Sequence, residues 1–249
     1  MNNHRFVFVL VLFSGMFMTE CKKGSDPPTD EEILGNIVRP EIIDEYKYPI
    51  HPGTPEWAKL TNHDEMLEAV SLPDSVLQKI STWGLVPTCF NYPLSGDYAA
   101  HNNQVAYMND LAQEFNGLKE LFAREDVPVI LLYDYRHLDF SLYQSFMDTQ
   151  FMELLIGCDA YVSRLDKRQL QYLAYVALEK ARYLREHFES GFPPYSYFIM
   201  ANAMIHYGYK PFIHYCSTNT ENSSGEFFLW GINAQAAQIG KYAEAFVNN

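Results

Sequence analysis

Two short stretches of the chain place a histidine close to carboxylates, an arrangement that general acid–base catalysis uses. His101 follows Asp97 by four residues, and two asparagines come directly after it. Further along, His137 lies between Asp134 and Asp139. Either pair could transfer protons if the fold placed it in a cleft that shifts its pKa. The alternative is structural, because Asp and Asn side chains commonly cap helices and carboxylates commonly line solvated helix ends.

The familiar motifs of nucleophilic, metal-dependent and phosphate-binding enzymes do not occur in the sequence. It contains no Gly-x-Ser-x-Gly, Ser-x-x-Lys or His-Glu-x-x-His, and no glycine-rich phosphate loop. His206 and His214 are not spaced like zinc ligands, and 68 and 57 residues separate Cys89, Cys158 and Cys216. We therefore expect no metal and no cofactor. The three cysteines allow at most one disulfide and are expected to act as small apolar groups.

Residues 192–215 are rich in aromatic side chains and are interrupted by glycine and proline. A helix is expected over Tyr195–Tyr207, ended by Gly208, and Pro211 is expected to prevent its extension. Exposed rings can stack on sugars or anchor a peptide, so this segment is the strongest candidate for a binding groove. The candidate ligand-binding residues are Tyr195, Tyr197, Tyr207, Tyr209, Phe212 and Tyr215, together with His101 and Asp97. Burial of the same rings between the last helices is the alternative.

The first 21 residues have the layout of a secretory signal peptide that ends at a cysteine. A short basic start precedes an apolar run of eight residues, Phe6–Phe13, which is too short to cross a bilayer. The segment closes on Met-Thr-Glu-Cys, which resembles a bacterial lipobox with Glu20 in place of the usual small residue. We expect residues 1–20 to be a lipoprotein signal peptide and a lipid on Cys21 to attach the protein to a membrane. An ordinary cleaved signal is the alternative.

The charge balance excludes several classes of partner. The chain has 249 residues and a formal net charge of −13, with 18 Lys and Arg against 31 Asp and Glu. Nucleic-acid binding requires clustered basic residues, and so does peripheral binding to anionic lipid heads. We therefore expect no nucleic-acid partner, and a glycan or a protein as the ligand.

The elements that must position these candidates have the periodicity of helices. Apolar residues recur every three or four positions over 143–165, 170–188 and 228–246, as in helices with one buried face. The helix over 170–188 carries a second apolar stripe, which indicates neighbours on two sides. Residues 127–135 are β-branched and aromatic, yet no partner strand follows them, so we assign them to a helix as well.

The segment after the signal has a different character, because residues 21–55 contain six prolines. We expect this segment to be a tether and a proline-rich strap, followed by one helical domain of eight to ten helices over 56–249. Residues 71–85 and 163–178 share a weak pattern of the kind that stacked helix pairs repeat. The predicted fold is therefore all-α, a single multi-helical domain, with a short armadillo- or HEAT-like superhelix as one arrangement.

Three segments resemble a known family. They are LVPTCFNYPL at 85–94, HNNQ at 101–104 and FNGLKELFARED at 115–126, and they are similar to segments in a family of uncharacterised lipoproteins of Bacteroidetes, many of them gut bacteria. The resemblance implies an all-helical domain and an outer-membrane lipoprotein, on the periplasmic face or at the cell surface. It implies no chemistry.

The sequence thus favours an envelope-anchored lipoprotein, a non-enzymatic binding or scaffold module with an aromatic helical groove. One alternative is an enzyme with a His/Asp site near 97–103 or 134–139, and another is a purely structural envelope protein. A cleft that gathers these histidines and carboxylates would favour the enzyme. A concave face of exposed tyrosines would favour the binding module.

Overall fold

The computed structural model describes residues 26–101, 103–140, 146–187, 195–218 and 232–249, so the predicted signal peptide and Cys21 lie outside the described residues. The described residues form thirteen α-helices, two short 3₁₀ helices and no strand, which confirms the predicted all-α single domain. No described helix combines the length and the apolar character that crossing a membrane requires.

The first half of the chain holds the shorter helices. They are α1 (Asp30–Leu34), the 3₁₀ helix η1 (Trp57–Lys59), α2 (His63–Val70), α3 (Asp74–Leu77), α4 (Thr82–Phe90), the 3₁₀ helix η2 (Ser95–Ala100), α5 (Gln104–Glu114), α6 (Asn116–Ala123) and α7 (Val127–His137). The second half contains α8 (Phe146–Gly157), α9 (Asp159–Val162), α10 (Lys167–His187), α11 (Ser196–Tyr207), α12 (Lys210–Thr218) and α13 (Ile232–Val247).

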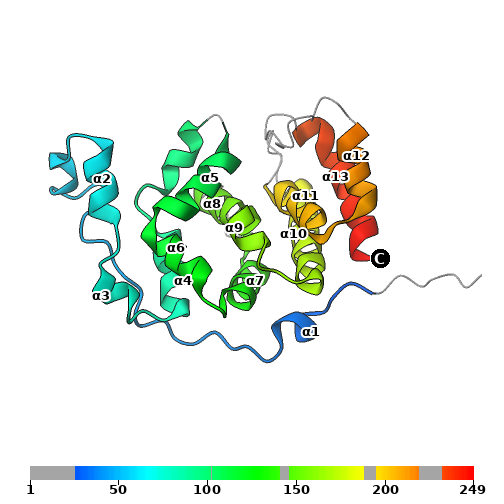
Figure 1. The fold of residues 1–249 in the computed structure, drawn as a ribbon, viewed down its shortest axis with the longest axis horizontal. Helices are drawn as coiled ribbons and strands as arrows, with labels where there is room; N and C mark the ends of the chain where they lie inside the picture. Colours follow the sequence, from blue (N-terminus) through cyan, green and yellow to red (C-terminus); the bar gives the residue numbers. More distant parts are fainter. Residues whose placement is uncertain (1–25, 102, 141–145, 188–194, 219–231) are drawn as a thin grey trace, which may run out of the picture.

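Helices α2 to α13 follow one another along the long axis of the molecule in approximately the order of the chain (Figure 1). The segment before them runs the other way. It starts at α1, beneath α7 and α10, and continues along the lower edge in Figure 1 towards α2 and α3. This arrangement brings the N-terminal segment against helices that are more than a hundred residues away in sequence. The armadillo- or HEAT-like superhelix stays a prediction.

Helix α10 lies at the centre of the C-terminal half. It packs against α11 and α13 on one side and against α1 and α7 on the other. On the side of α11 and α13, the side-chain amide of Gln171 donates a hydrogen bond to the Phe246 carbonyl of α13 at 3.3 Å. On the side of α1 and α7, the hydroxyl of Tyr172 donates a hydrogen bond to Asp30 of α1 at 2.8 Å. The predicted two-sided burial of this helix is therefore confirmed.

Helix α7 confirms the helical assignment of residues 127–135. Pro128 lies in its first turn, where a proline needs no hydrogen-bond donor and fits the helical backbone. Val127, Ile130, Leu131 and Leu132 are all buried, so apolar side chains surround much of the helix. Residues 127–132 are therefore apolar throughout, and the composition of this part of the helix resembles that of a buried strand.

Two details of the helix pattern were predicted wrongly. The apolar stripe over 143–165 is split in its described part into α8 and α9, because Cys158 is extended. A Cβ on Gly157 would lie 2.5 Å from the ring of Phe198, so the chain at this break is held close to α11. Helix α11 ends at Tyr207 before Gly208, as predicted, and Pro211 lies in the first turn of the next helix, α12. Because of such short helices, the described residues alone form thirteen α-helices, above the eight to ten predicted.

Candidate functional site

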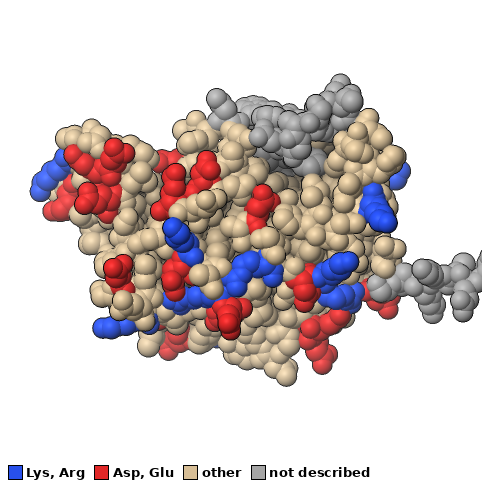
Figure 2. Space-filling model, viewed as in Figure 1, with Lys and Arg blue, Asp and Glu red and all other residues tan. Residues whose placement is uncertain are grey.

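The strap, residues 26–55, is fixed to the helical body by the carboxylates of α1. Asp30 accepts hydrogen bonds from Nε of Arg136 at 3.1 Å and from the hydroxyl of Tyr172 at 2.8 Å. Glu32 accepts from Arg168 of α10 through both oxygens, at 2.7 and 2.8 Å. Burial would raise the pKa of Asp30, but the two donors outweigh it and hold the pKa below its ordinary value. Basic and acidic side chains alternate along this lower edge (Figure 2).

Further along, the strap crosses α4 at Thr88. The backbone N–H of Tyr46 donates to Oγ1 of Thr88 at 2.9 Å, and the hydroxyl of Tyr48 donates to the Thr88 carbonyl at 3.2 Å. This carbonyl belongs to the last turn of α4, where carbonyls lack partners within the helix. A Cβ on Gly84 would lie 2.1 Å from the Asp44 carboxylate, so only glycine allows the strap this close.

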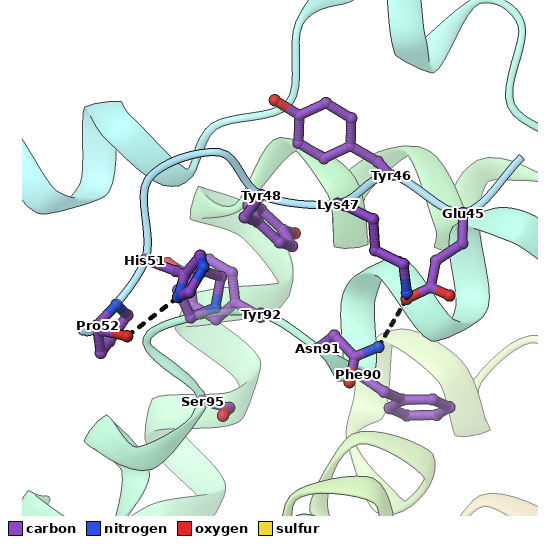
Figure 3. A pocket seen from close by; sticks show the side chains of 11 residues that line it. Glu45, Tyr46, Lys47, Tyr48, His51, Pro52, Phe90, Asn91, Tyr92 and Ser95 are labelled. Carbon is purple, nitrogen blue, oxygen red and sulfur yellow. Dashed lines mark hydrogen bonds and ion pairs between the residues drawn. The ribbon is translucent and has the colours of Figure 1, made fainter. Parts of the chain in front are cut away.

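An open groove with a volume of about 430 Å³ lies between the strap and the end of α4 (Figure 3). Tyr48 and Tyr92 line it as buried residues, whereas Tyr46 and Phe90 are half-buried and leave ring surface exposed. The complete lining is Glu45, Tyr46, Lys47, Tyr48, His51, Pro52, Phe90, Asn91, Tyr92, Pro93 and Ser95. The groove thus combines aromatic rings with side chains that form hydrogen bonds.

The polar groups of the groove centre on Glu45. Its Oε1 accepts from Nζ of Lys47 at 2.6 Å and from Nδ2 of Asn91 at 2.8 Å (Figure 3). Burial would raise the pKa of this carboxyl, but the two donors outweigh it and hold the pKa below its ordinary value. Within the described residues, no side chain binds Oε2. An ionised carboxylate with an oxygen to spare can accept a hydrogen bond from a ligand.

A second cavity, of about 260 Å³, contains the histidine and carboxylates predicted near 134–139. Asp134, His137 and Asp139 line it together with Arg39 of the strap. The Asp134 carboxylate is buried, and its Oδ1 lies 3.3 Å from the guanidinium of Arg39 without a hydrogen bond in the described residues. Burial raises the pKa of Asp134, and the charges of Arg39 and His137 oppose this only in part.

His137 is held by its own helix rather than by a carboxylate. Its Nδ1 lies 2.8 Å from the carbonyl of Tyr133, to which an Nδ1–H donates, and its ring stacks on that of Tyr133 with the centroids 4.1 Å apart. The tautomer that makes this hydrogen bond leaves Nε2 as an acceptor. The cleft therefore offers a carboxyl with a raised pKa and an imidazole, two groups that can exchange protons.

The other predicted pair, His101 and Asp97, lies elsewhere. Asp97 is on η2, with its Oδ2 3.9 Å from Nε2 of His63. His101 is exposed and contacts the ring of Tyr107, with the centroids 4.4 Å apart. Neither residue lines the cavities near the strap or α7. Asn103 caps α5 by accepting from the N–H of Ala106 at 3.0 Å, as the structural alternative predicts, and residue 102 lies outside the described residues.

The aromatic segment predicted as a groove packs largely against α13. Tyr197, Tyr209 and Phe212 are buried, with exposed fractions of 8%, 8% and 0%. Tyr195, Tyr207 and Tyr215 are half-buried. Rings of this segment contact two aromatic side chains of α13, as in the pairs Tyr207–Phe246, Tyr209–Phe246, Phe212–Tyr242 and Tyr215–Tyr242. The three buried rings therefore pack between the last helices, which was the alternative to a binding groove. Only the half-buried rings of Tyr195, Tyr207 and Tyr215 keep surface that a ligand could contact.

The histidines and cysteines considered for metal binding are also dispersed. No group of three His, Cys, Asp or Glu side chains that could hold a metal occurs in the described part of the chain. His206 pairs with Asp159 at 3.1 Å. Cys89, Cys158 and Cys216 are free thiols, and burial raises the pKa of each.

The strap groove was not predicted from the sequence, although two local signals point to it. Tyr46 and Tyr48 precede Pro49, and Phe90 and Tyr92 precede Pro93, so each segment presents two rings beside a helix-breaking residue. What the sequence does not show is that the two segments meet.

A comparison of the chain with models of protein families, with curated proteins and with solved structures finds no match.

Proposed function

We propose that the protein is a lipid-anchored protein of the outer membrane, on the periplasmic face or at the cell surface, that binds a glycan in the strap groove without catalysing a reaction. The anchor is supported by the lipobox-like sequence that ends at Cys21. Asp30, which is bound to α7 and α10, follows Cys21 by nine residues. A chain of that length spans at most about 30 Å, so the helical body would stay close to the membrane.

A substitution at the proposed lipidation site tests the anchor. Cys21→Ser removes the thiol, and the variant is expected to leave the membrane fraction and to incorporate no labelled fatty acid. Wild type expressed in the same cells is the reference. Membrane association of the variant at the wild-type level would contradict the anchor.

The observation that carries the binding proposal is the joint presence of ring surface and an available carboxylate oxygen in the groove. Tyr46 and Phe90 offer partly exposed rings, and Oε2 of Glu45 can accept from a hydroxyl. Sugars combine apolar C–H faces with many hydroxyls, and they are bound by stacking on rings and by hydrogen bonds to carboxylate and amide groups. Asn91 and Ser95 add further polar side chains to the same lining.

The test is a glycan array with the full-length protein in detergent, followed by titration of any glycan that binds. Glu45→Gln is expected to weaken binding about tenfold, because a hydrogen bond to a charged group contributes about 1.5 kcal/mol or more. Tyr46→Ala removes a partly exposed ring but leaves the backbone bond to Thr88 intact. Tyr215→Ala, in the aromatic segment of α12, is the control expected to bind normally. Loss of binding in the control alone would contradict the strap groove.

The cleft at the end of α7 supports a second candidate function, an enzyme that transfers protons. The observation in its favour is the buried Asp134 carboxyl, whose pKa is raised, beside the imidazole of His137. Such an enzyme would lose turnover in Asp134→Asn and keep it in Asp97→Asn, since Asp97 does not line the cleft. Screening with hydrolysable glycosides and esters, with both variants in parallel, separates this function from simple binding.

A further inference from the structure

A third cavity, of about 410 Å³, lies between the end of α7 and the middle of α10. Leu138, Phe140 and Tyr183 give it apolar and aromatic walls, and the charged side chains that line it are Arg136, Asp139, Glu179 and Lys180. Leu138 and Asp139 also line the Asp134 cleft, whereas Lys180 lines neither that cleft nor the strap groove. A cavity of this size holds a small organic molecule.

The amine of Lys180 is held without a carboxylate partner. Its Nζ donates to the carbonyl of Leu138 at 2.7 Å and lies 4.4 Å from the centroid of the Phe140 ring and 5.4 Å from that of Tyr135. Among the described residues it forms no ion pair. The carbonyl and the two rings favour the ammonium form, but they replace only part of the water that a lysine normally keeps.

Burial is the largest influence on this amine and lowers the pKa of Lys180 to about 8. The charged groups around it are Glu153 of α8, Arg136 of α7, Glu179 of α10 and Asp139 after α7. The three carboxyl groups raise the pKa and Arg136 lowers it further. At pH 7.5 about a quarter of such amines are neutral, against about a thousandth for an unperturbed lysine with a pKa near 10.4.

The Tyr135 ring connects Lys180 to a buried carboxyl, that of Glu153. The Tyr135 ring that Lys180 contacts carries a hydroxyl that donates to Oε1 of Glu153 at 3.0 Å, and the Ser196 hydroxyl donates to the same oxygen. Glu153 is buried, and burial raises its pKa to about 7 although both hydroxyls and Lys180 oppose this. Desolvation of a lysine beside aromatic walls keeps part of its amine neutral, and a neutral amine can act as a nucleophile.

We propose that Lys180 is a carbonyl-reactive amine that binds a small aldehyde as a Schiff base in the cavity between α7 and α10. The neutral amine adds to the carbonyl carbon, and a proton moves from nitrogen to oxygen to give a carbinolamine. Protonation of the hydroxyl group and loss of one water then leave the protonated imine, which gives the neutral imine when its nitrogen releases that proton to solvent. No oxidant or reductant takes part, and the aldehyde is the only co-reactant. The Phe140 and Tyr183 walls favour an aldehyde with an apolar or aromatic group.

The experiment traps the imine in the full-length protein. The protein is incubated at pH 7.5 with benzaldehyde and cyanoborohydride, which reduces an imine to a stable secondary amine, and modified lysines are located by peptide mass spectrometry. Lys180 is expected to be modified at least about tenfold faster than the exposed Lys210 and Lys241. Its rate is expected to saturate with aldehyde concentration and to reach half its maximum near pH 8.

Two variants make the result decisive. Lys180→Arg keeps a cation in the cavity and is expected to abolish the fast modification while exposed lysines react as before, which also reports that the variant is folded. Glu153→Gln removes a carboxyl that raises the pKa of Lys180, so the pH profile of modification is expected to move to lower pH. Modification of Lys180 no faster than that of exposed lysines, or a linear dependence on benzaldehyde, overturns the proposal. The glycan assay above is independent of either outcome.

Discussion

Replacing Glu153 by Gln is expected to make the protein less sensitive to alkaline pH. The Glu153 side chain is 1% exposed and accepts hydrogen bonds from the hydroxyls of Tyr135 and Ser196. Burial raises its pKa from 4.5 to about 7, while the unfolded chain keeps the ordinary value. Between these two pKa values the folded protein holds a proton that the unfolded chain has released.

The sign and the size of the effect follow from that difference. Because the folded state binds the extra proton, the free energy of unfolding is largest below pH 4.5 and falls as the pH rises towards 7. The difference between a pKa of 4.5 in the unfolded chain and about 7 in the folded protein corresponds to about 3 kcal/mol of unfolding free energy. Glutamine cannot ionise and avoids this loss, although its amide adds N–H donors, and each one left without a partner costs about 1 kcal/mol.

Urea unfolding followed by circular dichroism at pH 5 and pH 8 measures the effect. Wild type is expected to be as stable as the variant or more stable at pH 5, and less stable at pH 8. Comparing the two proteins at each pH cancels the contributions of titrating groups that do not interact with Glu153, a condition that Lys180 does not meet. The difference should change by up to about 3 kcal/mol. The reasoning is refuted if the difference is the same at both pH values or changes in the opposite direction.

Three further substitutions test contacts that hold the fold and the strap in place. Thr88→Val removes the acceptor of the Tyr46 N–H and is expected to cost about 1 kcal/mol; faster proteolysis within the strap measures this, and unchanged protection would contradict it. Gly157→Ala places a Cβ 2.5 Å from the Phe198 ring, so a loss of about 1–3 kcal/mol is expected in urea unfolding. Arg168→Met breaks the ion pair with α1 and should expose that helix to protease with little change in the global unfolding midpoint, whereas a large drop would show that α1 supports the whole fold.

The helices that depend on local sequence could be predicted. The apolar periodicity over 170–188 marks α10, and Gly208 ends α11 in the left-handed conformation with φ +80° that glycine allows. These features arise from residues within a few turns of one another. The close packing at Gly157, beside the break, could not be predicted in the same way, because it involves the ring of Phe198 about forty residues later.

The strap groove was not predicted from the sequence because it also depends on contacts between residues that are far apart in the chain. Its two walls, 45–52 and 90–95, are joined by the bonds of Tyr46 and Tyr48 to Thr88, which lies about forty residues away. Neither periodicity nor composition specifies such a pairing. Charge gave no guidance either, because a chain with a net charge of −13 offers many carboxylates that could meet Arg136 or Arg168.

The two aromatic segments show why composition alone could not separate packing from binding. Rings on the last helices lie on an amphipathic surface that a neighbouring helix can cover, and α13 covers Tyr209 and Phe212. The strap buries the Tyr48 ring against α4 but leaves that of Tyr46 half-buried. Residues two apart point to the same side of an extended chain, so Tyr46 and Tyr48 meet edge to face with centroids 5.3 Å apart. The strap therefore keeps Tyr46 half-exposed at the groove, where a ligand can reach it, while the richer aromatic segment serves mainly the core.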